Sequence, residues 1–137
     1  MTQEPKELLL KDICARLPYG IKASYYGVEE ECETWDEIEG ITLDGYVDIG
    51  QYSLPIESIK PYLFPLSSMT EEQKKYITNR WGINEDFNFE IDPNWGEYIV
   101  ELGDTINFIN WLNENRFDIN NLIPKGLAID ATGLNIY

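Results

Sequence analysis

The spacing of the apolar residues changes near residue 20 from that of a helix to that of strands, and this change limits the folds that the chain can adopt. Residues 5–17 have helical spacing, and their apolar members share one broad side: Leu8, Leu9, Leu10, Ile13, Cys14 and Leu17. The charged residues lie largely opposite: Lys6, Glu7, Lys11, Asp12 and Arg16. Pro18 and Gly20 are typical helix stops, and the pattern from Ile21 onward is that of strands. A helix followed at once by strands predicts an α+β fold.

Residues 21–54 predict three or four short antiparallel strands. Asp44-Gly45 separates two apolar runs, and Asp-Gly at such a place is a strong short-range signal of a hairpin because both residues tolerate positive φ. We therefore expect a small β-meander, short enough to curl into an SH3-like barrel. The prolines at 55, 61 and 65 predict a packed connector over residues 53–66. Its apolar residues are expected in the core: Ile56, Ile59, Leu63 and Leu66.

Two further helices are predicted. Overlapping capping boxes over residues 68–71 and 70–73 predict a helix that starts within two residues of Thr70 and ends at Gly82. A second helix is expected over residues 105–116 with Asp104 as its N-cap. Its inward residues should be Ile106, Phe108, Ile109, Trp111 and Leu112. The apolar segment from Leu122 to Tyr137 is expected to dock as an extended C-terminal tail.

Residues 86–97 allow two interpretations. Their acidic and amide side chains superficially copy the ligand spacing of a calcium loop. However, Ile91 stands where the sharp turn of that loop needs glycine, and Phe87, Phe89 and Ile91 alternate as in a half-buried strand. A strand is the preferred interpretation.

Length and charge restrict the class of protein. A chain of 137 residues with 43% hydrophobic residues can bury one modest core, so we expect a single domain over residues 1–137. The net charge of −15 disfavours direct binding to nucleic acid or to a membrane and points to a basic protein as partner. No apolar run of membrane-spanning length and no signal-peptide pattern is present, and we expect a cytoplasmic protein with reduced cysteines.

The densest charged feature is an acidic run over residues 29–39 that contains no Lys or Arg. Its carboxylates form the candidate partner-binding surface: Glu29, Glu30, Glu31, Glu33, Asp36, Glu37 and Glu39. Three interpretations remain open. The run is a solvated loop and strand edge protected by like charge, a surface that imitates a phosphate backbone for a basic partner, or a divalent-cation site.

No catalytic or cofactor-binding pattern stands out. The chain has no histidine, which removes the commonest general base and the Ser-His and Cys-His nucleophile pairs. Neither a phosphate-binding loop nor a nucleophile elbow is present. We therefore expect a protein that is not an enzyme and that has no cofactor and no bound metal.

Three segments carry a resemblance: residues 6–20, 59–73 and 122–137, together with Asn113-Glu-Asn-Arg-Phe-Asp118. In this order they resemble a group of short proteins of unassigned function carried by phages and integrated elements of gut Bacteroides-type bacteria. The resemblance implies no catalytic residue. It implies a context in which a small acidic protein regulates or inhibits a nucleic-acid-handling protein of the host.

The leading hypothesis is an acidic, non-enzymatic domain that binds a basic protein through residues 29–39. The alternative is a structural or self-assembling protein that associates through apolar surface near Trp95 and the tail. A carboxylate-based or metal-dependent enzyme ranks last.

Overall fold

The chain starts with a helix that ends where the sequence predicts. The computed structural model describes residues 2–84 and 102–137. Helix α1 (Gln3–Arg16) passes into a 3-10 turn, Leu17–Tyr19, and Gly20 leaves that turn with a φ of 83°. A positive φ at this place is easiest for glycine, so the chain can change direction there and enter the sheet.

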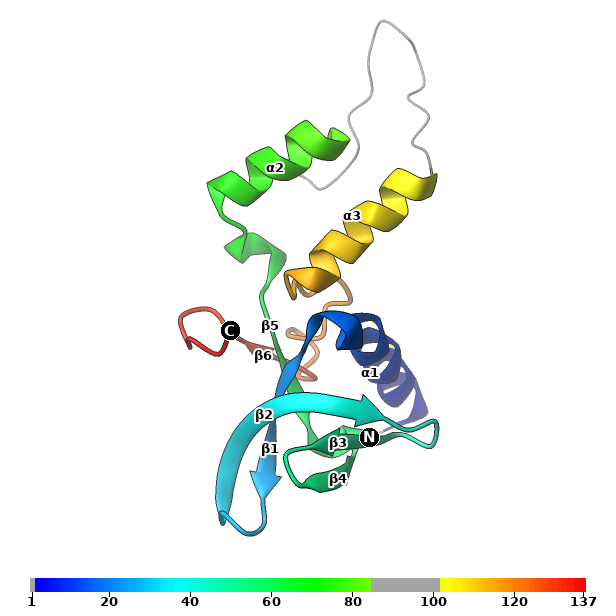
Figure 1. The fold of residues 1–137 in the computed structure, drawn as a ribbon, viewed down its shortest axis with the longest axis vertical. Coiled ribbons are helices and arrows are strands. Elements are labelled where there is room, and N and C mark those ends of the chain that lie inside the picture. The colour runs from blue at the N-terminus through cyan, green and yellow to red at the C-terminus, as the bar shows by residue number, and fades with distance from the viewer. Residues whose placement is uncertain (1, 85–101) are drawn as a thin grey trace, which may run out of the picture.

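The sheet has six strands: β1 (Lys22–Gly27), β2 (Cys32–Ile41), β3 (Tyr46–Ile49), β4 (Tyr52–Pro55), β5 (Lys60–Leu63) and β6 (Ile129–Asp130). Their order is β4-β3-β2-β1-β5-β6 (Figure 1). The first five strands pair antiparallel, and β6 pairs parallel with β5. The α+β class with an N-terminal helix and an antiparallel meander is confirmed.

Two tight turns shape the meander. The predicted hairpin turn at Asp44-Gly45 joins β2 to β3, with a φ of 85° at Gly45 and a hydrogen bond from its N–H to the Thr42 carbonyl. A second turn, at Gly50, joins β3 to β4. A Cβ at Gly50 would stand 2.5 Å from the Tyr25 hydroxyl oxygen, so this turn needs glycine for space as well as for its φ of 57°.

The proline-rich connector is more regular than predicted. Residues Ile56–Ser58 form a 3-10 turn, and β5 follows and returns to pair with β1. Ile56, Ile59 and Leu63 are buried as expected, whereas Leu66 is only half-buried, at the start of a 3-10 turn over Leu66–Ser68. Pairing of the fifth strand with the first is the strand order of an SH3-like barrel. In the described residues β4 is not hydrogen-bonded to β5, so the barrel stays open.

Helix α1 covers one face of the sheet, and together they enclose the sheet core: Leu9, Ile13, Ile21, Ala23, Tyr25, Ile38, Val47, Ile49, Ile56, Ile59, Leu63, Leu122 and Ala128. Two expectations for α1 are wrong. Cys14 is exposed, and Asp12 and Arg16 are buried.

Asp12 and Arg16 are buried because they pair with each other and bond to the chain after α3. The Arg16 Nε donates to Asp12 at 2.9 Å, and its Nη2 donates to Asp12 and to the Phe117 carbonyl. Asn120 also donates to Asp12 at 2.8 Å. Nearby, Arg116 donates to the carbonyls of Tyr19 and Gly20. We call these contacts the polar seam, because they join α1 and the turn that follows it to residues 116–120.

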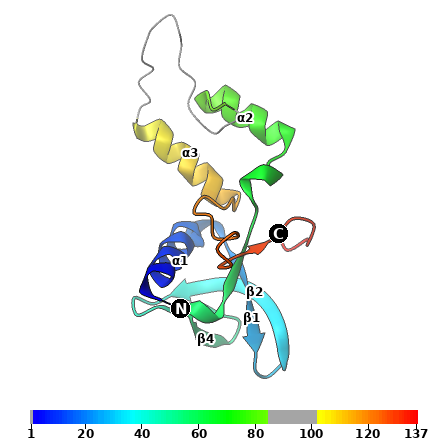
Figure 2. The same ribbon diagram turned by 180° about the vertical axis from the view of Figure 1, so that it is seen from behind.

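The two predicted later helices are present as α2 (Glu71–Trp81) and α3 (Leu102–Glu114). For α2 the prediction is confirmed in detail, since Thr70 and Gln73 form the reciprocal capping box and Gly82 ends the helix in the left-handed region. Figure 2 shows both helices beyond one end of the sheet, reached from β5. They pack through a second group of side chains, the aromatic cluster: Met69, Ile77, Trp81, Ile83, Phe108, Leu112 and Phe117.

Helix α3 differs from its prediction at its start and on one side. It begins at Leu102, so Asp104 lies in its first turn and is not the N-cap. Phe108 and Leu112 are buried as predicted, but Ile106 and Ile109 are exposed. Phe108 and Leu112 are four residues apart and share one side, which turns the two isoleucines away from it. The predicted strand over residues 87–92, Trp95 and the apolar patch at Tyr98 lie outside the described residues.

The C-terminal tail docks, as expected. Ile136 is buried against Tyr62 and Ala131. The hydroxyl of Tyr137 accepts from the Lys22 N–H at 2.9 Å and donates to the Tyr62 carbonyl at 2.8 Å. The tail therefore lies against the face of β1 and β5 that α1 leaves free.

Candidate partner-binding face

The β1–β2 hairpin separates its side chains onto two faces. Its register pairs Lys22 with Glu37, Ser24 with Trp35 and Tyr26 with Glu33. Residues directly opposite each other in an antiparallel pair point to the same side, so these six share one face. The alternate residues Ala23 and Tyr25 are buried in the sheet core. The six side chains therefore form what we call the outer face of the hairpin.

Aromatic rings and carboxylates lie side by side on the outer face. Tyr26 is 52% exposed and Trp35 is 43% exposed. Glu33 and Glu37 flank Trp35 along β2, and Glu33 accepts a hydrogen bond from Ser24. Exposed rings next to carboxylates suit a cationic side chain, which can contact the ring face and the charge together.

The outer face is hollowed next to these residues. Ser24 and Glu33 line a cavity of about 340 Å³ together with Ser58, Lys60 and Ile129. These residues come from β1, β2, the β4–β5 connection, β5 and β6, so the hollow follows from the strand order. It offers space for a side chain of a partner beside the exposed rings.

The three carboxylates of the β1–β2 turn form a separate group. The Tyr52 hydroxyl donates to Glu30 at 2.9 Å and accepts from the Glu29 N–H, and Gln51 donates to the Glu29 carboxylate at 2.7 Å. These bonds tie the turn to β4. Glu31 is exposed and has a φ of 58°, a left-handed conformation that lets the turn close.

The remaining two predicted residues have different surroundings. Asp36 lies on the inner side of β2, half-buried, and accepts from the Tyr25 hydroxyl at 2.5 Å. Burial and this bond raise the pKa of Tyr25 above its ordinary value. Glu39 is the extra residue of a bulge, because Ile38 and Gly40 pair with the adjacent Ile49 and Asp48. Its side chain is exposed.

The seven predicted carboxylates therefore form three groups: the turn, the outer face with the bulge, and Asp36 within the sheet. Four of the seven lie on β2, which is not a sheet edge, since it lies between β1 and β3. Within residues 2–84 and 102–137, no Lys or Arg nitrogen lies within 4.0 Å of any of the seven carboxylates. Their charge is thus uncompensated by ion pairs in this part of the chain.

The sequence reasoning missed Trp35, Lys22 and Tyr137. The Lys22 ammonium nitrogen lies 5.1 Å from the centroid of the Trp35 ring and 5.5 Å from that of Tyr137. The Arg116 guanidinium lies 4.0 Å from the centroid of the Tyr137 ring. A period of two within residues 33–37 would have placed Trp35 with Glu33 and Glu37. No local signal indicates the contacts with residue 137, which join segments far apart in the chain.

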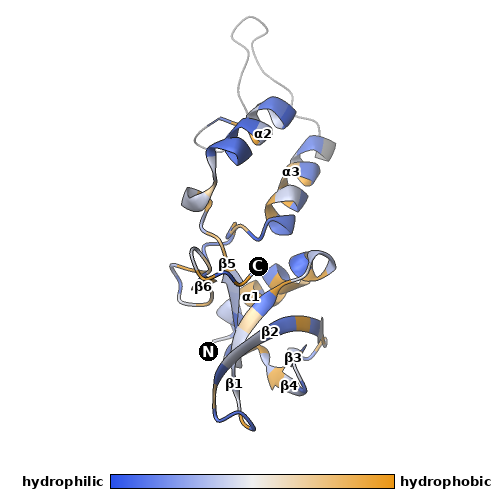
Figure 3. Ribbon diagram, turned by 60° about the vertical axis from the view of Figure 1, so that its left-hand side comes forward, coloured by the Kyte–Doolittle hydropathy of each residue, from blue (hydrophilic) through white to orange (hydrophobic). Residues whose placement is uncertain are grey.

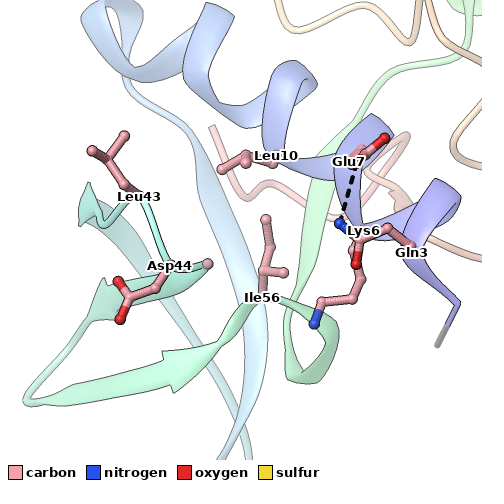
Figure 4. Close-up of a pocket in the computed structure, with 8 residues that line it drawn as sticks. Gln3, Lys6, Glu7, Leu10, Leu43, Asp44 and Ile56 are labelled. Carbon is pink, nitrogen blue, oxygen red and sulfur yellow. Dashed lines mark hydrogen bonds between the residues drawn. The ribbon is translucent and has the colours of Figure 1, made fainter.

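A second hollow lacks the groups that a small-molecule site needs. It has a volume of about 190 Å³ and lies between the start of α1 and the β2–β3 turn (Figure 4). Its lining includes Lys6, Leu10, Leu43 and Ile56. Leu43 is fully exposed, and the one hydrogen bond drawn there joins Gln3 to Glu7 on the same helix. No set of polar groups converges on a common point among these residues.

The described residues fit neither a metal site nor a membrane-spanning helix. They contain no group of three His, Cys, Asp or Glu side chains placed to hold a metal ion. None of the helices described is long and apolar enough to cross a membrane. The chain matches no family model, and no curated protein and no solved structure matches it.

Proposed function

We propose that this chain is a protein-binding domain without enzymatic activity, and that it engages a basic protein through the outer face of the β1–β2 hairpin. The observation that carries the proposal is the placement of two exposed aromatic residues, Tyr26 and Trp35, among carboxylates that form no ion pair with Lys or Arg in the described part of the chain. Tyr and Trp are enriched at binding hot spots, and uncompensated charge steers an oppositely charged partner.

The kind of partner follows from the charge. With a net charge of −15, the domain attracts proteins whose surfaces bind polyanions, and nucleic-acid-handling proteins are the main class with such surfaces. The resemblance to phage-borne proteins supports a regulator or inhibitor of such a protein in the host. The outer face would occupy the basic surface that otherwise binds nucleic acid.

The test compares two double variants with the same change in net charge. Glu33→Gln with Glu37→Gln removes charge from the outer face, and Glu72→Gln with Glu114→Gln removes it from exposed positions on α2 and α3. Binding of a labelled lysine- and arginine-rich peptide is measured at low and high salt by fluorescence anisotropy. We expect the outer-face variant to weaken binding about tenfold at ~50 mM salt and the helix variant to weaken it far less. Equal losses, or binding indifferent to salt, would remove the outer face from consideration.

A second candidate function is self-assembly, and one specific observation favours it. Ile106 and Ile109 on α3 and Tyr76 on α2 are each more than 40% exposed. Such apolar exposure is typical of surfaces that associate. Light scattering at high micromolar concentration tests it, because Ile106→Lys with Ile109→Lys should convert an oligomer to a monomer. A wild-type protein that is already monomeric there contradicts self-assembly.

A further inference from the structure

The ring of Trp35 already carries a cation, and that cation comes from the chain itself. Lys22 stands diagonally across the β1–β2 ladder from Trp35, and its ammonium lies over the ring at 5.1 Å. It lies directly opposite Glu37 but forms no ion pair with it in the described structure. Instead it donates to the Ile136 carbonyl at 2.8 Å. The tail, and not the facing carboxylate, sets the position of this ammonium group.

The tail is fixed at that point by a hydroxyl group inserted into the sheet. The β1–β5 ladder pairs Ser24 with Lys60 and Ala23 with Pro61, so Lys22 and Tyr62 would form the next pair. Their N–H and carbonyl do not bond to each other directly. The Tyr137 hydroxyl bridges them, accepting from Lys22 at 2.9 Å and donating to Tyr62 at 2.8 Å. Docking of the tail therefore places the Ile136 carbonyl where Lys22 reaches it.

We propose that Trp35 is the anchor of the outer face and that it accepts a lysine or arginine side chain of the partner over its ring, in the place that Lys22 fills. This inference rests on the proposed function and adds to it the group recognised and the internal competitor. A partner cation at that place would contact the ring and approach Glu33 and Glu37, with which Lys22 forms no ion pair in the described residues. Lys22 gives up one hydrogen bond to a carbonyl, and its ammonium group moves toward solvent.

The charge around Trp35 and its exposure explain why a cation suits this place and an apolar side chain does not. Trp35 is flanked by two carboxylates on its own strand, and the residue is 43% exposed. An apolar group placed there would bring those carboxylates next to apolar surface and remove water from them, which is costly. An ammonium or guanidinium group gains from both kinds of neighbour.

The experiment separates release of the ring from the change in net charge. Lys22→Met removes the internal cation, and Lys60→Met removes the same charge from β5, beside the hollow of the same outer face, without uncovering the ring. The probe is a fluorescently labelled oligolysine peptide, and the measurement is its dissociation constant. We expect Lys22→Met to tighten binding about two- to fivefold more than Lys60→Met. Trp35→Leu in the Lys22→Met background should abolish that extra gain.

A tail variant provides a second route to the same result. Tyr137→Ala removes the hydroxyl bridge that holds the tail, so Lys22 loses its anchor while keeping its charge. We expect tighter peptide binding here too, in protein whose circular dichroism shows a retained fold. Equal effects of Lys22→Met and Lys60→Met would overturn the inference and leave the proposed function standing if Glu33→Gln with Glu37→Gln still weakens binding. A wild-type protein that does not bind the peptide at all would overturn both.

Discussion

The sheet core and the aromatic cluster are built in different ways within one short chain. The sheet core is mostly aliphatic, and its members from α1 and the strands, such as Leu9, Ile49 and Leu63, are fully buried. The aromatic cluster brings α2 and α3 together through rings, with Trp81 and Phe108 at 5.5 Å between centroids. It closes less completely, since Tyr76 stacks on Trp111 at 5.5 Å yet remains 47% exposed.

The difference shows how two short helices can be held with few core residues. An aromatic side chain buries a larger area than an aliphatic one, so a small number of rings can join two helices. Most of α2 is hydrophilic (Figure 3), and its buried residues are Ile77 and Trp81. The aromatic cluster therefore depends on its attachment to the rest of the molecule. The polar seam supplies part of that attachment. Substitutions in it therefore test first whether the two regions depend on each other.

The largest expected effect comes from Arg16→Met. The substitution leaves the Asp12 carboxylate buried without its cation and the Phe117 carbonyl without its donor. Breaking a buried pair in this way typically costs about 3–5 kcal/mol. We expect a loss of that size in the free energy of unfolding, measured by urea denaturation and followed by both circular dichroism and tryptophan fluorescence.

Two control variants show whether the loss of stability in Arg16→Met comes from the buried ion pair. Lys74→Met removes the cation of an exposed pair with Glu71, and exposed pairs contribute only about 0–1 kcal/mol. Asp12→Leu combined with Arg16→Met replaces the buried pair with apolar groups and should recover much of the loss. A loss for Arg16→Met no larger than that for Lys74→Met would show that the polar seam does not hold the two regions together.

The next effect compares the two cores directly. Ile49→Ala in the sheet core and Ile77→Ala in the aromatic cluster delete the same atoms from side chains that are 0% and 2% exposed. Such deletions cost about 2–5 kcal/mol, and the cost is lower where neighbours can move into the space. We expect about 4 kcal/mol for Ile49 and about 2 kcal/mol for Ile77, because the cluster has a half-exposed margin. Equal losses in urea denaturation would show that both regions are packed with equal rigidity.

The contrast also separates what sequence can predict from what it cannot. Capping at Thr70 and the turn at Gly45 depend on residues close in the chain, and both are confirmed. The helical pattern alone places Asp12 and Arg16 on the outward side, which is wrong, because their partners Phe117 and Asn120 lie about a hundred residues away. The start of α3 was also misplaced, because Asp104 satisfies the N-cap preference without occupying the N-cap position.

The candidate site follows the same division. The sequence alone shows the acidic run. How its carboxylates divide into three groups depends on the strand period and on the bulge at Glu39. The period alone would have placed Trp35 beside Glu33 and Glu37. The contribution of Lys22 depends on the tail, which docks through Tyr137 from the other end of the chain. A local pattern contains no information about that contact.

A smaller effect tests the start of each helix. The Thr70 hydroxyl oxygen accepts from the Gln73 N–H in the capping box of α2, whereas Thr2, the N-cap residue of α1, makes no side-chain cap bond. Thr70→Ala should cost about 1 kcal/mol in the free energy of unfolding. Thr2→Ala is the matched control and should cost close to nothing. Equal losses in thermal or urea denaturation would contradict the capping account.

The smallest effect appears only in alkali and concerns the sheet core. Burial and the hydrogen bond to Asp36 raise the pKa of Tyr25 above 10.0, its ordinary value. Below pH 10 the Tyr25 hydroxyl is protonated in both the folded and the unfolded state, so it does not make the free energy of unfolding depend on pH. Above pH 10 the unfolded chain releases this proton and the folded chain keeps it, so the stability due to the protonated hydroxyl declines as pH rises. The stability difference between wild type and Tyr25→Phe, measured by urea denaturation, should therefore shrink above pH 10. A difference that stays constant with pH would mean that Tyr25 ionises as readily in the folded sheet as in the unfolded chain.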